Sequence, residues 1–186
     1  MKIVGIGLNK TGTKTLGWCM KYWGFSHVSC SEDAFKLYCD GDFEKLLSWV
    51  DAYDSFEDWP WPLFYQLIDR RFPGSKFILT RRKDPETWFA SLCAHADRTG
   101  PAMFRKHIYG HEMPHAHKEH HIKIYIEHLS ACREYFKNRQ SDFLEVCFED
   151  GDGWGELASF LGLPLPLIKF PHENRNPVNH INQEKP

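Results

Sequence analysis

The first sixteen residues place the strongest constraint on this chain. The apolar, β-branched run at 3–8 predicts a buried strand, and Leu16, Cys19, Met20 and Trp23 follow at helical spacing. Between them lies the turn Asn9-Lys10-Thr11-Gly12-Thr13-Lys14-Thr15. Its glycine lets successive N–H groups point inward, the helix start adds a positive partial charge, and lysines and hydroxyls surround both. The segment therefore predicts a phosphate-ester site. The alternative is an ordinary strand–helix turn with surface lysines.

The spacing of this turn departs from two common nucleotide-binding loops. A Walker A loop has its lysine directly after the second glycine. Gly7 and Gly12 have the Walker spacing, but Thr13 occupies the lysine position. A Rossmann turn fits less well, because Lys10 stands where its third glycine belongs. The characteristic feature here is a lysine placed two residues before the glycine.

Length and composition indicate one globular domain over residues 1–186. The chain is 42% hydrophobic and 26% charged, which suits an α/β domain with a fully buried sheet core. A net charge of −2 argues against a nucleic-acid partner. The six cysteines form no Cys-x-x-Cys pair, no secretory apolar segment starts the chain, and no apolar run approaches the roughly 18 residues of a membrane span. We therefore expect a cytoplasmic protein; the sequence leaves its oligomeric state open.

Strand and helix patterns alternate along the chain. Strands are expected, after the first, at 25–29, 52–56, 76–80 and 143–148. Helices are expected at 32–49 with a break at 40–42, and at 63–72, 85–95, 116–138 and 154–161. Residues 98–115 are expected to be irregular, and 98–138 to form a lid or helical insertion over the substrate. The alternation predicts an α/β fold: a mostly parallel five-stranded sheet with helices on both faces and ligands at the carboxyl ends of its strands.

A second candidate anion site follows the strand at 76–80. Arg81, Arg82 and Lys83 come directly after it, and Ser91 lies about two turns into the next helix. A guanidinium and a hydroxyl together suit a terminal phosphate, although a solvated charge run is the alternative. Two anion sites on one sheet edge predict a ligand with two phosphate groups.

These motifs resemble those of sulfotransferases that use 3′-phosphoadenosine 5′-phosphosulfate (PAPS). Residues 10–15 resemble the 5′-phosphosulfate loop, and 82–91 resemble the 3′-phosphate motif. The chain is similar to a compact P-loop subfamily also at Asp58-Trp59-Pro60, at 153–162 and at 170–174. The likeness covers most of the chain apart from 98–138 and the last ten residues. It implies a P-loop-type three-layer sandwich, PAPS as donor, 3′-phosphoadenosine 5′-phosphate (PAP) as product and no metal.

The sulfonate transfer implied by the resemblance needs a cation at the transferred group and a base for the acceptor proton. The expected catalytic residues are Lys10, as the cation, and Asp58, as the base, because Asp58 follows a strand and should lie at the same sheet edge. A helix cap is the alternative role for Asp58, and Glu57 and His95 are further candidates for the base. The cofactor-binding residues are expected to be Lys10, Thr11, Gly12, Thr13, Lys14, Thr15, Arg82 and Ser91.

The chain departs from the family pattern at two points. Arg82 and Ser91 are nine positions apart, one more than usual, so Lys83 is the alternative 3′-phosphate ligand. The family's long Gly-rich segment near the C-terminus is not found, and residues 172–175 are the candidates to replace it. The acceptor is expected to be a hydroxyl or amine of a small molecule or glycan, bound by 98–138 and by the aromatic stretch 59–65. Four aromatic side chains are candidates to line its pocket, although aromatic residues after a strand more often belong to the core: Trp59, Trp61, Phe64 and Tyr65.

Two other functions and one other site are weighed against this hypothesis. A P-loop kinase using ATP and Mg²⁺ is one, and a non-catalytic relative of the fold is the other. His117, His120 and His121 share a helix face that can hold zinc, but no Cys or carboxylate completes such a site. We therefore expect the His-rich stretch 107–128 to be a solvated or lid segment.

Overall fold

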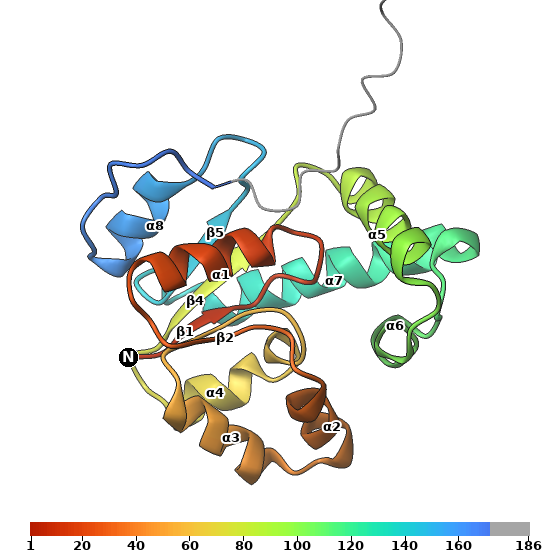
Figure 1. The fold of residues 1–186 in the computed structure, drawn as a ribbon, viewed down its shortest axis with the longest axis horizontal. Helices are drawn as coiled ribbons and strands as arrows, with labels where there is room; N and C mark the ends of the chain where they lie inside the picture. Colours follow the sequence, from red (N-terminus) through yellow and green to blue (C-terminus); the bar gives the residue numbers. More distant parts are fainter. Residues whose placement is uncertain (172–186) are drawn as a thin grey trace, which may run out of the picture.

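The sheet is parallel throughout and central to the molecule (Figure 1). A computed structural model describes residues 1–171. Its strands have the order β2-β3-β1-β4-β5, and every neighbouring pair is parallel. Their bounds are β1 Ile3–Gly5, β2 His27–Val28, β3 Ser55–Phe56, β4 Lys76–Thr80 and β5 Phe143–Val146. The carboxyl ends of all five strands therefore lie at one edge of the sheet, and the candidate site residues follow these ends.

Helices cover both faces of the sheet (Figure 1). α1 (Thr13–Tyr22) and α8 (Trp154–Leu161) pack on one face. The other face carries α2 (Glu32–Asp40), α3 (Phe43–Ala52), α4 (Tyr65–Arg71), α5 (Pro85–Thr99), α6 (Met103–Tyr109) and α7 (Lys118–Phe136). Two short 3-10 helices, η1 (Trp61–Leu63) and η2 (His115–His117), complete the described elements. The predicted three-layer α/β sandwich is confirmed.

The side-chain alternation of the central strands divides the core into two. In β4, Phe77 and Leu79 face the layer of α2–α7, whereas Ile78 faces α1 and α8. All three are fully buried, because a parallel sheet is covered on both faces. The apolar run that marks β4 in the sequence is therefore the centre of both cores.

The predicted strands and helices differ from the observed ones mainly at their ends. β1 stops at Gly5, although the apolar run continues to Leu8. The Ile6 N–H still donates to the Ile78 carbonyl at 2.8 Å. Beyond it, a Cβ at Gly7 would lie 2.1 Å from Thr80 Oγ1, so the chain crosses the end of β4 at close range and cannot continue the ladder. Burial keeps residues 6–8 apolar after the strand has ended.

The expectation of an irregular 98–115 stretch is wrong. α5 continues to Thr99, and α6 occupies 103–109. Arg105 and Tyr109 are buried and hold α6 in place: the Arg105 guanidinium donates to the carbonyls of Gly100 and Glu112. Tertiary contacts thus stabilise a helix too short to be stable on its own.

The expected insertion 98–138 contains a part of the main fold. Tyr125, Leu129, Cys132 and Phe136 of α7 are buried in the core shared with β4 and β5. A lid over the substrate thus remains a prediction for the part of the stretch that precedes α7. None of the helices within residues 1–171 is long and apolar enough to cross a membrane.

Candidate active site

The backbone of the turn after β1 bends through left-handed conformations. Lys10 has φ 70°, and Gly12, the N-cap of α1, has φ 100°. A Cβ at Gly12 would lie 2.8 Å from the Phe148 ring, which packs directly on this residue. Glycine at 12 is therefore required both by the backbone and by the ring above it.

The threonine hydroxyls of the turn are used partly within the protein. The Thr11 hydroxyl donates to the Leu8 carbonyl at 2.6 Å and pairs with Thr80 Oγ1 at 2.6 Å. It ties the turn to the end of β4, so we expect Thr11 to serve a ligand through its backbone N–H. The Thr13 hydroxyl donates to Asp58 Oδ2 at 3.3 Å, and Thr15 is buried in the first turn of α1. Lys14 is exposed.

Several positive charges converge on Lys10. Burial lowers the pKa of its ammonium group, and the charges of Arg98, Lys14 and Arg82 lower it further, while Asp58 raises it. These groups come from α1, α5 and the loops after β3 and β4. Several cations near the start of one helix can stabilise a bound polyanion.

Asp58 lies at the end of β3, next to this cationic site. Its backbone is left-handed, with φ 64°, and its Oδ1 accepts the Trp59 N–H at 2.9 Å. Burial and the neighbouring Glu57 charge raise the pKa of the Asp58 carboxyl to about 7. A carboxylate with a pKa near 7 can accept a proton at neutral pH.

Glu57 and His95, the other candidates for the base, lie in surroundings that differ from those of Asp58. Glu57 is 1% exposed and lies beneath α1, where it accepts the Ser29 hydroxyl and lies 3.5 Å from His27 Nε2. A Cβ at Gly17 of α1 would lie 3.1 Å from Glu57 Oε1, so Glu57 faces the helix above it. Burial and the charges of Lys10 and other cations lower the pKa of His95 to about 4, so His95 is a neutral imidazole at pH 7.

The Arg82 side chain and the Lys83 backbone contact the same carboxylate, Glu149. Arg82 Nη2 lies 2.8 Å from Glu149 Oε1, and the Lys83 backbone N–H donates to Glu149 Oε2 at 3.1 Å. The Arg82 charge acts on Lys10, whereas the Lys83 residue is exposed. Ser91 is half-buried on α5, four positions before His95 and thus on the same helix face.

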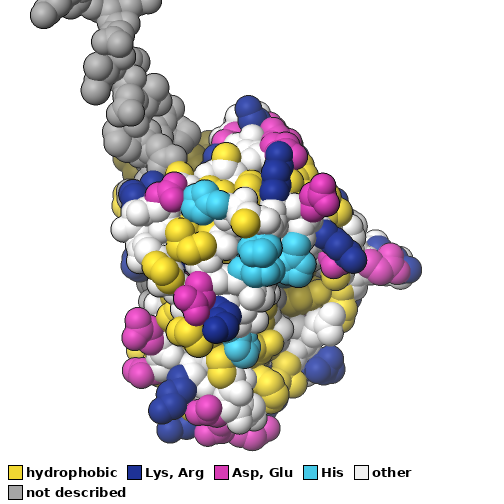
Figure 2. Space-filling model, turned by 90° about the vertical axis from the view of Figure 1, so that its right-hand side faces the viewer, with side chains coloured by type: hydrophobic (Ala, Val, Ile, Leu, Met, Phe, Trp, Pro, Cys, Tyr) yellow, Lys and Arg dark blue, Asp and Glu magenta, His cyan; other side chains and the backbone are white. Residues whose placement is uncertain are grey.

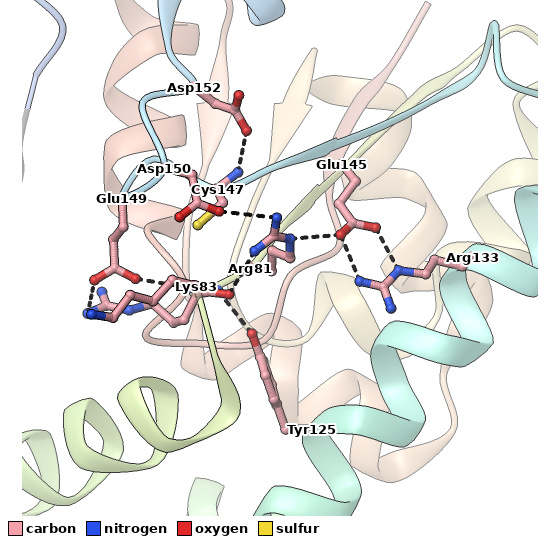
Figure 3. Close-up of polar contacts among 10 residues, drawn as sticks. Arg81, Lys83, Tyr125, Arg133, Glu145, Cys147, Glu149, Asp150 and Asp152 are labelled. Atoms are coloured by element: carbon pink, nitrogen blue, oxygen red, sulfur yellow. Dashed lines mark hydrogen bonds and ion pairs between the residues drawn. The ribbon is translucent and has the colours of Figure 1, made fainter.

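The Arg81 side chain has a structural role. Its Nε lies 2.8 Å from Glu145 Oε1, and its Nη2 lies 3.3 Å from Asp150 Oδ2. Arg133 of α7 binds the same Glu145 at 2.7 Å (Figure 3). This network joins the ends of β4 and β5 to α7. Arg81 thus pairs with two carboxylates, Glu145 and Asp150, whereas Arg82 pairs with Glu149.

Comparison with known proteins identifies the family. The family model described as "Sulfotransferase domain" matches residues 2–177. The chain belongs to this sulfotransferase family. It is also similar to "Ava biosynthesis cluster protein M" of Aspergillus versicolor, at 25% identity over 219 aligned positions that cover 92% of this chain and 80% of that protein. The family assignment gives the protein a sulfotransferase-type, group-transferring function.

The aromatic side chains expected to bind the acceptor of this sulfotransferase lie in the core. They are at most 6% exposed and pack under the sheet: Trp59, Trp61, Phe64 and Tyr65. Of the two roles predicted for these side chains, the structure supports the core role and not the lining of the acceptor pocket. In a sequence, an aromatic run after a strand looks the same whether its side chains line a ligand pocket or pack in the core.

Several histidine side chains are visible on one face of the molecule (Figure 2). The rings of His111 and His117 stack at 3.4 Å, and His120 and His121 adjoin them. Among residues 1–171, His, Cys, Asp and Glu side chains form no group of three or more that could hold a metal. Residues 172–175, the expected replacement for the family's Gly-rich segment, lie outside the described residues.

Three residues near the site, Arg98, Phe148 and Tyr109, had no recognised signal in the sequence. Arg98 lies seven positions after Ser91 on one face of α5, and extending that helix to Thr99 would have revealed it. Phe148 covers Gly12, and Tyr109 contacts Asn9. Only the fold brings these last pairs together, because each pair is more than ninety positions apart in the chain.

Proposed function

We propose that the protein transfers the sulfonate group of PAPS to an acceptor hydroxyl or amine. The observation that carries the proposal is the convergence of Lys10, Lys14, Arg82 and Arg98 on a left-handed turn that starts α1, with Asp58 beside them. The donor carries phosphate groups on the 3′ and 5′ positions of its ribose, and two cationic segments follow the neighbouring parallel strands β1 and β4. When bound, the donor supplies the sulfonate group.

The proposed donor site has two parts. Residues 10–15 bind the 5′-phosphate through backbone N–H groups and the ammonium groups of Lys10 and Lys14. Arg82 and Ser91 bind the 3′-phosphate, with Lys83 as the alternative cation. Lys10 holds its positive charge where negative charge develops on the leaving phosphate, and this lowers the barrier. PAP leaves as the product.

Asp58 is the proposed base. Its carboxylate takes the proton of the acceptor hydroxyl as the new bond forms, which requires the ionised form. The Thr13 hydroxyl and the Trp59 N–H orient the two carboxylate oxygens. The acceptor is proposed to be a small molecule or glycan bound over the part of 98–138 that precedes α7. All six cysteines are free, which fits a cytoplasmic location.

The test is transfer of ³⁵S from labelled PAPS to a panel of hydroxyl and amine acceptors. We expect labelled product with at least one acceptor class, loss of transfer in Lys10→Met, and strong loss in Asp58→Asn. A parallel panel with labelled ATP and Mg²⁺ tests the kinase alternative. Phosphoryl transfer from ATP without any sulfonate transfer would overturn the proposal, and binding of neither nucleotide would favour a non-catalytic relative.

A further inference from the structure

Tyr109, the last residue of α6, reaches the turn that carries Lys10. Its hydroxyl donates to Asn9 Oδ1 at 2.6 Å. Tyr109 is fully buried, and Asn9 is 8% exposed. Because water has little access to this contact, removing the hydroxyl leaves the Asn9 oxygen without a partner.

Asn9 is held by its backbone as well. The Trp88 indole N–H of α5 donates to the Asn9 carbonyl at 3.0 Å. The rings of Trp88 and Tyr109 are in contact, with centroids 5.9 Å apart. Two helices thus fix the residue that directly precedes Lys10.

The contacts that hold Asn9 matter because the next residue, Lys10, has an unusual backbone conformation. A non-glycine residue at φ 70° is in a sparsely populated conformation, and such conformations persist where the surroundings hold them. The contacts to Asn9 lie one peptide bond before this strained residue. They supply the restraint that the Lys10 conformation needs.

The other end of Tyr109 is fixed on the opposite side. His120 Nε2 lies 2.9 Å and His111 Nδ1 lies 3.2 Å from the Tyr109 carbonyl oxygen. The His121 ring adjoins the tyrosine ring, with centroids 5.4 Å apart. Tyr109 is therefore a rigid connection between the histidine cluster and the turn.

We propose that Tyr109 is a positioning residue for Lys10. It holds Asn9 so that the turn 10–15 keeps the left-handed conformation in which its N–H groups and its ammonium group face the donor. The role in donor binding rests on the proposed function, whereas the ordering of the turn does not.

The experiment compares Tyr109→Phe with Tyr135→Phe, a matched loss of one hydroxyl. The Tyr135 hydroxyl donates to Asp69 Oδ2 at 2.7 Å, in a contact between α7 and α4. We expect Tyr109→Phe to speed amide hydrogen exchange of residues 9–15 in the ligand-free protein by about tenfold, and to weaken PAP binding by a similar factor. Tyr135→Phe should change neither.

Asn9→Ala removes the same hydrogen bond from the other side, and it serves as the second variant where Tyr109→Phe does not fold. The double variant should exchange no faster at 9–15 than the faster of the single variants. Unchanged exchange at 9–15 in both single variants overturns the proposal, as does an equal increase in Tyr135→Phe. Faster exchange at 9–15 together with no PAP binding by the wild type would overturn the proposed function and leave the positioning role standing.

Discussion

At the scale of the residue, Asp58 is the group whose environment says most about function. Its raised pKa predicts that kcat/KM for sulfonate transfer falls below about pH 7, by about tenfold per pH unit, because protonation removes the base. The pH profile of initial rates measures this directly. The same profile separates the candidates, because a fall that begins only near pH 4 would assign the base to His95.

The ionised Asp58 carboxylate should also lower the stability of the folded protein. Its pKa is raised from 3.8 in the folded state, so between about pH 4 and 7 the folded protein binds more protons than the unfolded one. Stability therefore falls as pH rises through this window. We expect Asp58→Asn to raise the free energy of unfolding by about 1–3 kcal/mol at pH 8 and to have little effect near pH 4. Urea denaturation at the two pH values measures the difference. Equal effects at both would show that the carboxylate is not destabilised by burial.

The roles of Arg82 and Lys83 in binding the 3′-phosphate can be distinguished with two nucleotides. Loss of a charged hydrogen-bond partner of a phosphate costs about 1.5–3 kcal/mol, or roughly 10–100-fold in affinity. Arg82→Ala should weaken PAP by that factor and adenosine 5′-phosphosulfate, which has no 3′-phosphate, very little. Lys83→Ala should leave both nearly unchanged. The reverse pattern in calorimetric titrations would assign the 3′-phosphate to Lys83.

At the scale of the element, the backbone at Gly7 passes the end of β4 at very close range. A Cβ at Gly7 would lie 2.3 Å from the Thr80 carbonyl oxygen, which is backbone and cannot move aside. We expect Gly7→Ala to destabilise the protein by about 3 kcal/mol or more and to disrupt the Thr11–Thr80 contact. Gly155 of α8 has open space at its Cβ position and is the matched control. Gly155→Ala should be neutral or stabilising by up to about 1 kcal/mol. A Gly7→Ala protein as stable as the wild type would contradict this geometry.

The elements also show how far sequence reasoning reaches. β4 and α8 were predicted with the observed bounds, because an apolar strand and a helix ended by Gly162 have strong local signals. α6 was missed, because its seven residues lie between Gly, Pro and His and are held by the buried contacts of Arg105 and Tyr109. Its existence depends on the fold more than on its own propensity.

At the scale of the molecule, the parallel sheet explains why the candidate site could be predicted in part. All carboxyl ends meet at one edge, so the residues after β1, β3 and β4 had to lie near one another. That rule brought Lys10, Asp58 and Arg82 together from the sequence. It could not show that the Thr11 hydroxyl faces the protein, or that Tyr109 contacts Asn9 from a position one hundred residues away. Such contacts depend on side-chain packing between distant elements.

The central claim is that this edge binds PAPS through the Lys10 turn without a metal. The most direct measurement is calorimetric titration of PAP into the wild-type protein in EDTA, with Lys10→Met in parallel. We predict one PAP per chain and at least about a tenfold loss of affinity in Lys10→Met. No heat of binding for PAP in EDTA, together with saturable binding of ATP in Mg²⁺, would contradict it.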